Sequence, residues 1–220
     1  PEDSVELPRG EIVGIRGLGL NDSIRAYHST KNMLKIGNLR LQNQDILVLM
    51  DKIISFSSIT GEKINGILGS EILKDYVVEI SYSRQRITFY THESYAVPGS
   101  YKRIPAIVAG SKMYVNANVI NNGITNENLA MLIDTGAEIG AWFQTIRADA
   151  FELPEKRIHG YIGEGLNGEI HGYYAVIDSL NIGPFYLKKP IVTFPDSLYI
   201  ADFIIRSSRD GTLGNQVLKR

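Results

Sequence analysis

The sequence predicts an all-β protein with a few short helices, built from two related lobes. Three observations support this fold class. Residues 77–90 alternate in polarity and are rich in β-branched and aromatic side chains, as strands are. Glycine and asparagine turn signals separate most of the short apolar runs. A long internal repeat occurs twice, which indicates two copies of one unit rather than a solenoid.

The strands are expected to form antiparallel hairpins. In the segment 31–50, short apolar runs are separated by Gly37-Asn38 and by polar residues 42–44. The segments 104–109 and 113–120 flank Gly110-Ser111, and residues 121–123 (Asn-Asn-Gly) supply the next turn. Such pairs of glycine- or asparagine-containing residues favour tight hairpin loops.

Helices are expected to be few and short. One candidate covers residues 145–153 and ends before Pro154. Two others would follow apolar-apolar-Gly sites, where Ser70 and Asn215 occupy equivalent positions. Both residues are good N-caps, because their side-chain oxygens can accept hydrogen bonds from the first helical turn.

The repeat consists of three blocks in the same order. Residues 17–21 match 163–167 and residues 34–37 match 180–183, each at an offset of 146. Residues 66–74 match 211–219 at an offset one residue shorter. We therefore divide the chain into a partial first lobe at 1–90, a linker at 91–103 and a second lobe at 104–220.

Composition excludes several function classes. The formal net charge is −1, from 23 basic and 24 acidic residues, without the basic cluster that a nucleic-acid surface needs. The uncharged apolar runs, of which 46–50 is one of the longest, are too short to span a bilayer. The chain has no cysteine, so disulfides and thiol chemistry are excluded, and its four histidines show no tight metal-ligand spacing. We expect no metal and no cofactor.

An acidic residue follows a buried strand in the second lobe. The apolar run 129–133 leads directly into Asp134-Thr135-Gly136, with Ala137 next. A buried carboxylate is costly unless it is paired or its chemistry is used. Asp-x-Gly alone is also ordinary turn chemistry, so the triplet gains weight only from its context.

A glycine-rich hairpin is expected at 163–172. Its glycines match the spacing of a dinucleotide-binding fingerprint, but the residues that follow read as a strand, whereas that fingerprint requires a helix. Asn167-Gly168 instead indicates a type I′ hairpin turn. The repeat gives this hairpin a first-lobe counterpart around Gly17 and Gly19.

These motifs resemble the two-lobed retropepsin-like aspartic peptidases. Each lobe of that family carries Asp-Thr-Gly, a flap hairpin, and apolar-apolar-Gly followed by a short helix. The second lobe here has all three, with Thr212 at the first apolar place and Leu213-Gly214 after it. The first lobe has the hairpin and Ile67-Leu68-Gly69, but not the triplet.

The resemblance implies two acid-protease-like β-barrel lobes, the first lacking its N-terminal part and the second its last strands. Counting back by the repeat, the partner of Asp134 would lie about twelve residues before Pro1. Asp134 is then the catalytic residue, supported by its three following neighbours. The resemblance implies that Thr135, Gly136 and Ala137 support the catalytic loop. The implied flap residues are Gly17, Gly19, Gly163, Gly165, Asn167 and Gly168. The implied apolar-apolar-Gly residues are Ile67, Leu68, Gly69, Leu213 and Gly214.

The expected function is an aspartic endopeptidase that acts on peptide or protein substrates through two aspartates and an activated water. A missing N-terminal segment or a second chain would complete the pair, so residues 1–220 alone should be inactive. Two alternatives remain: an inactive relative that binds extended peptides, and a structural β-domain. The compartment is unknown because the true N-terminus is expected to lie outside the sequence; an extracytoplasmic location is slightly favoured.

Overall fold

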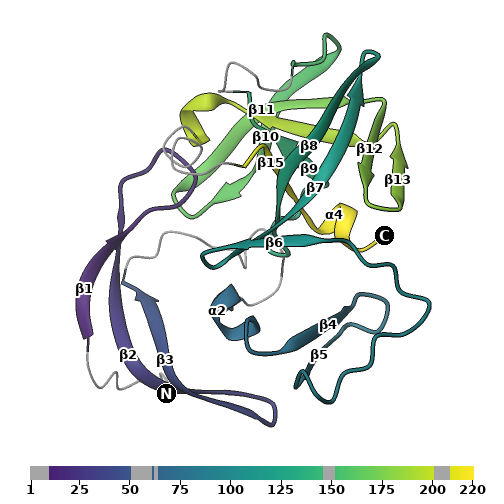
Figure 1. Cartoon of the computed structure of the whole chain (residues 1–220). Coiled ribbons are helices and arrows are strands. Elements are labelled where there is room, and N and C mark those ends of the chain that lie inside the picture. Colours follow the sequence, from purple (N-terminus) through teal and green to yellow (C-terminus); the bar gives the residue numbers. More distant parts are fainter. Residues whose placement is uncertain (1–9, 51–60, 62–63, 146–151, 201–208) are drawn as a thin grey trace. The chain divides into compact units, whose positions relative to one another are not determined.

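The computed structural model describes residues 10–50, 61, 64–145, 152–200 and 209–220 (Figure 1). The chain forms two compact units. Unit 1 contains Pro1–Ile67 together with Glu164–Gly168, and unit 2 contains Leu68–Gly163 and Glu169–Arg220. Most of the described secondary structure is β-strand, which confirms the predicted all-β class. No helix among the described residues is long and apolar enough to cross a membrane.

Unit 1 contains a three-stranded antiparallel sheet in the order β1-β2-β3. Its strands are β1 (Gly10–Ile15), β2 (Ile24–Ile36) and β3 (Leu39–Leu49). Strand β2 is central, and Ile24 and Ala26, near the start of this strand, are fully buried. Further along β2 the side chains become exposed or half-buried, so the sheet is anchored mainly at one end.

Unit 2 contains a ten-stranded sheet in the order β10-β11-β14-β9-β15-β8-β7-β12-β13, with β6 pairing β7 (Figure 1). The bounds are β6 (Ala106–Ala109), β7 (Lys112–Asn121), β8 (Ile124–Ile133), β9 (Ala141–Phe143), β10 (Arg157–Gly165), β11 (Gly168–Val176), β12 (Ser179–Ile182), β13 (Phe185–Lys188), β14 (Ile191–Pro195) and β15 (Gly211–Leu213). The tip of the β10–β11 hairpin, Glu164–Gly168, belongs to unit 1.

Further elements of unit 2 lie outside that sheet. Strands β4 (Val77–Ser81) and β5 (Arg86–Tyr90) form a two-stranded antiparallel hairpin, within the segment predicted as strand. Two short helices, α2 (Ser70–Leu73) and α4 (Asn215–Leu218), each of four residues, directly follow the two apolar-apolar-Gly sites, and residues 197–200 are helical as well.

Two of the predicted hairpin turns of the second lobe are present. Strands β6 and β7 close around Gly110-Ser111, with Ala109 opposite Lys112. Strands β7 and β8 close around Asn122-Gly123, whose φ angles of +50° and +76° are both left-handed. Two successive left-handed residues are what a type I′ turn requires, and this explains the Asn-Gly sequence.

Equivalent segments of the repeat fold alike within their own units. Gly37 (φ +57°) begins a two-residue turn that places Ile36 opposite Leu39 in β2–β3. Gly183 (φ +54°) begins the same turn between Ile182 and Phe185 in β12–β13. The lobe boundaries at 1–90, 91–103 and 104–220 stay a prediction.

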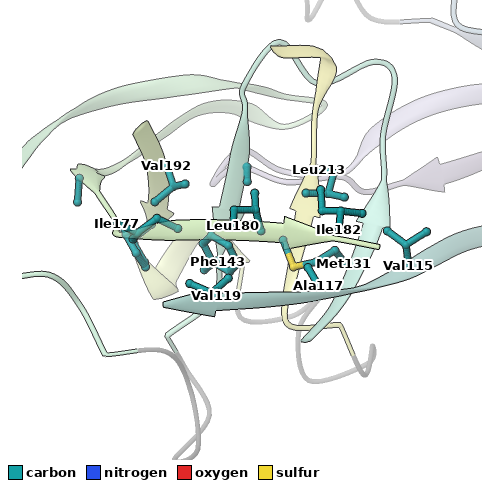
Figure 2. Close-up of a cluster of buried hydrophobic side chains, with 13 residues drawn as sticks. Val115, Ala117, Val119, Met131, Phe143, Ile177, Leu180, Ile182, Val192 and Leu213 are labelled. Carbon is teal, nitrogen blue, oxygen red and sulfur yellow. The ribbon is translucent and has the colours of Figure 1, made fainter. Parts of the chain in front are cut away.

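The core of unit 2 forms where the inward faces of the sheet strands meet (Figure 2). Side chains alternate along β7, so that every second residue enters the core while its neighbours face away. Burying one large apolar side chain stabilises the fold by about 1.5–3 kcal/mol. The cluster contains Val115, Ala117, Val119, Met131, Ala141, Phe143, Ala175, Ile177, Leu180, Ile182, Val192, Phe194 and Leu213.

Two local predictions were wrong and one falls outside the described residues. Ser70 and Asn215 are the first helical residues, because the glycines before them adopt extended backbone and occupy the cap positions without a side-chain cap bond. In the glycine-rich hairpin, Gly168 has a φ of +104° but Asn167 is not left-handed, so the type I′ turn is absent there. Most of the helix expected at 145–153 lies outside the described residues.

Candidate active site

Strand β8 carries Asp134 to the end of the large sheet. Strand β15 lies between β8 and β9, parallel to β8, with Leu213 opposite Ile133. The backbone N–H of Asp134 donates to the carbonyl of Leu213 at 3.0 Å. The chain leaves the sheet at this point, so the Asp134 side chain is half-buried rather than enclosed in the core.

A tight turn holds the Asp134 carboxylate. The backbone N–H of Gly136 donates to Asp134 Oδ1 at 2.9 Å, and that of Ala137 donates to the Asp134 carbonyl at 3.3 Å. A Cβ at position 136 would lie 3.2 Å from the same Oδ1 atom. Glycine therefore lets the backbone approach the carboxylate without crowding it.

The loop that follows Asp134 wraps around the end of β15. Three backbone hydrogen bonds join the loop to the start of α4: Gly214 N–H to the Gly140 carbonyl at 2.8 Å, Asn215 N–H to Ala137 at 2.8 Å, and Gln216 N–H to Ile139 at 3.1 Å. A Cβ at Gly214 would lie 2.3 Å from the Ile139 carbonyl oxygen. The second apolar-apolar-Gly site and the start of α4 thus hold the Asp134 loop in place through backbone hydrogen bonds.

Asn215 supports the Asp134 loop through its side chain, which the sequence does not predict. Its side-chain amide donates to the carbonyl of Thr135, and its Oδ1 accepts from the Tyr82 hydroxyl. The only signal in the sequence was its place beside Gly214, which was interpreted as a helix cap. This part of the loop is held through the Thr135 carbonyl.

Arg209 and Asp210 also act on this region without having been predicted. Asp210 Oδ2 accepts from the Ala130 N–H at 2.8 Å, which ties the approach of β15 to β8. The guanidinium of Arg209, 6% exposed, lies over the Trp142 ring with 4.9 Å between Cζ and the ring centroid. Burial lowers the pKa of Arg209, an effect that the nearby acidic groups of Tyr114 and Asp134 partly oppose.

The predicted flap glycines of the two repeats meet within unit 1. Gly19 pairs with Asn167 as an isolated parallel bridge, and the Asn167 N–H donates to the Leu18 carbonyl at 2.8 Å. Gly163, in contrast, has open space around its Cβ direction. The structure therefore brings Gly17, Gly19, Gly165, Asn167 and Gly168 together, and leaves Gly163 on the arm of the hairpin.

The first-lobe apolar-apolar-Gly site lies in a different environment from the second. Ile67 and Leu68 are 72% and 52% exposed, and Gly66 to Gly69 contain no strand. Leu213, at the position that repeats Leu68, is 1% exposed inside the sheet. Of the two copies, only Leu213-Gly214 is seen supporting the Asp134 loop in the described structure. Among all residues that the structure describes, no three His, Cys, Asp or Glu side chains lie together so that they could hold a metal ion.

Comparison with known proteins supports the resemblance. Residues 115–217 match the model of a family described as aspartyl protease. A solved retropepsin-like aspartic protease from Rickettsia conorii is similar at 22% sequence identity, covering 54% of this chain and 89% of that chain, with a TM-score of 0.36. No curated protein matches the sequence. The family match thus confirms the expected resemblance to aspartic peptidases for residues 115–217.

Proposed function

We propose that this chain, whose residues 115–217 match the aspartyl protease family, provides the Asp134 half of an aspartic endopeptidase. The observation that carries the proposal is the Asp134 loop itself. A half-buried carboxylate stands at the end of β8, accepts the Gly136 N–H, and is braced from behind by Gly214 and Asn215. A mere surface turn does not need a second segment, about 80 residues away, to hold its backbone.

The reaction needs a second carboxylate beside Asp134. No other aspartate among the 220 residues is followed by Thr-Gly or Ser-Gly. The second group therefore comes from an equivalent loop in polypeptide other than residues 1–220, or from a second copy of this chain. A lone copy of residues 1–220 should not cleave peptides, because one carboxylate cannot serve as both acid and base in the same step.

Two adjacent carboxylates do not both ionise readily, so the pair holds one proton between them. The ionised member takes a proton from a water molecule, which attacks the scissile carbonyl carbon. The protonated member donates its proton to the carbonyl oxygen. The tetrahedral intermediate then collapses: the carboxyl that took the water proton donates it to the leaving amine nitrogen, and the hydroxyl formed from the carbonyl oxygen returns its proton to the other carboxylate. The Gly136 N–H fixes the direction of the Asp134 carboxylate throughout these transfers.

The substrate class is an extended peptide or protein segment. Extended peptides are recognised by backbone hydrogen bonds and by pockets for alternate side chains. The β10–β11 hairpin has the long arms and glycine-rich tip that suit a covering flap, which would exclude water from the reacting carbonyl.

The test compares Asp134→Asn with the unsubstituted protein in the complete enzyme, using a mixed peptide library between pH 3 and 7. We expect cleavage to fall at least about a hundredfold, since a positioned acid or base contributes that much or more. Glu127→Gln is the control, because it removes an exposed carboxylate from the same strand. Cleavage by Asp134→Asn at the original rate would refute the proposal, and peptide binding without cleavage by the unsubstituted protein would favour the inactive relative.

A further inference from the structure

Asn167 is a polar residue with no exposed surface at the tip of a hairpin. Hairpin tips are normally solvated, and a buried amide side chain is costly unless all its polar atoms are bonded. The residues that enclose it belong to the same compact unit, in the loop between β1 and β2. Its burial therefore marks a specific contact between the tip Glu164–Gly168 and that loop.

Every polar group of Asn167 is used in this contact. Its Oδ1 accepts from the Gly17 N–H, and its Nδ2 donates to the carbonyls of Asn21 and Asp22. Its backbone N–H donates to the Leu18 carbonyl at 2.8 Å, and its own carbonyl accepts from the Asn21 N–H at 3.0 Å. An uncharged amide of this shape can supply two donors and one acceptor at once, which suits the three side-chain bonds.

The glycines of both tips are explained by the same contact. A Cβ at Gly17 would lie 2.3 Å from Leu166 Cβ, and one at Gly165 would lie 2.2 Å from the Leu18 carbonyl oxygen. A Cβ at Gly19 would lie 2.2 Å from the Asn167 carbonyl oxygen. Any side chain at these positions would push the two segments apart, so the close approach of the tip and the loop requires glycine at each of them.

The contact is one-sided although the sequences of the tips repeat. Asn21 occupies the position that matches Asn167 in the repeat, yet it is exposed and enters the contact through its backbone N–H and carbonyl. The Asn21 side chain lies beside Gly168, where an added Cβ would be 2.6 Å from Asn21 Nδ2. Asn167 alone inserts its amide into the opposite loop.

We infer that Asn167 is a latch, a positioning residue that ties the β10–β11 tip to loop 17–22 before any substrate is present. The latch holds the tip against loop 17–22, so that little ordering of the tip remains to be done when a peptide binds. This consequence for catalysis rests on the proposed peptidase function, whereas the latch itself does not.

The latch is tested by amide hydrogen exchange on the complete protein. Asn167→Ala removes three side-chain bonds, and we expect the Gly17 and Asn21 amides to exchange at least about tenfold faster, with core amides of β7 unchanged. Asn21→Ala is the matched control and should leave these rates within about twofold. Equal acceleration by both variants, or none by Asn167→Ala, would overturn the latch.

A second pair of variants separates the tips without touching Asn167. Gly17→Ala places a Cβ against Leu166 and should accelerate the same amides, whereas Gly160→Ala, on β10 with nothing within 4 Å, should not. If Gly17→Ala leaves the exchange unchanged while it folds normally, the tips are not held as inferred.

Peptide cleavage then separates positioning from general destabilisation. Preorganisation lowers the free energy spent on binding, so Asn167→Ala should raise KM about tenfold and change kcat less than about threefold. A fall in kcat at constant KM, with a lower Tm, would show a structural role only and overturn the positioning claim. If the unsubstituted protein cleaves no peptide but the exchange result holds, the proposed function fails and the latch remains.

Discussion

The side-chain amide of Asn215 donates a hydrogen bond to the backbone carbonyl of Thr135, across 80 residues of sequence. The same Asn215 accepts from the hydroxyl of Tyr82. The residue next to the proposed catalytic aspartate is therefore held from behind by the first residue of α4. Catalytic groups need neighbours that fix their geometry to fractions of an ångström, and Asn215 provides that support.

Asn215→Ala should weaken both the fold and the activity. The Thr135 carbonyl loses its donor, and a lost hydrogen bond of this kind costs about 1 kcal/mol of unfolding free energy. We expect a lower Tm and a several-fold lower kcat. Gln216→Ala, at an exposed position in the same helix, is the control and should change neither quantity measurably. Full activity in Asn215→Ala would show that Thr135 needs no such support.

Gly214→Ala and Gly69→Ala form a matched pair from the repeat. A Cβ at Gly214 would lie 2.3 Å from the Ile139 carbonyl oxygen and 2.7 Å from that of Ala137, whereas nothing lies within 4 Å of one at Gly69. Overpacking against backbone typically destabilises by about 1–3 kcal/mol. Chemical denaturation should therefore show a loss for Gly214→Ala and almost none for Gly69→Ala; equal losses would contradict the described backbone contacts.

Leu213→Ala and Leu68→Ala test the different environments of the two apolar-apolar-Gly sites. Leu213 is 1% exposed inside the sheet and Leu68 is 52% exposed. Truncating a buried leucine costs about 2–5 kcal/mol through lost transfer energy and the cavity left behind. The midpoint of urea unfolding should fall clearly for Leu213→Ala and by much less for Leu68→Ala. A large loss for Leu68→Ala would mean that this side chain is buried in the protein in solution.

The stability contributed by Asp178 should depend on pH. Its side chain bonds Lys189, and also the Gly123 N–H at 3.3 Å; these bonds, Lys189 first, lower the pKa of Asp178. A lowered folded-state pKa means that the stabilisation is complete above the ordinary value of about 3.9 and is lost as the pH falls through the folded value. The Tm difference between the unsubstituted protein and Asp178→Asn should thus be present at pH 7 and vanish in strong acid. A difference that grows on acidification would contradict this sign.

Local signals in the sequence are sufficient to predict the all-β fold class and several of the hairpin turns. Asn122-Gly123 is left-handed at both positions because that dipeptide tolerates this backbone, and strand alternation on β7 reflects its one buried face. The triplet at Asp134 indicated a carboxylate at a strand end, and the structure places it there. These features depend on residues that are adjacent in the chain.

Features that depend on distant residues could not be predicted. Asn215 was interpreted as a helix cap because its partner, Thr135, is remote in sequence. Asn167 was interpreted as part of a type I′ turn, since nothing local reveals that its amide is buried in loop 17–22. Arg209 gave no signal, because only the fold brings it over the Trp142 ring. In each of these cases tertiary contacts prevailed over local propensity.

Whether Asp134 shares one proton with a second carboxylate is best measured through the pH dependence of kcat/KM. We expect a bell-shaped profile with both limbs in the acid range, because one member of the pair must be ionised and the other protonated. Asp134→Asn should abolish the profile altogether. A single ionisation near neutral pH, or an unchanged profile in Asp134→Asn, would show that Asp134 is not part of such a pair.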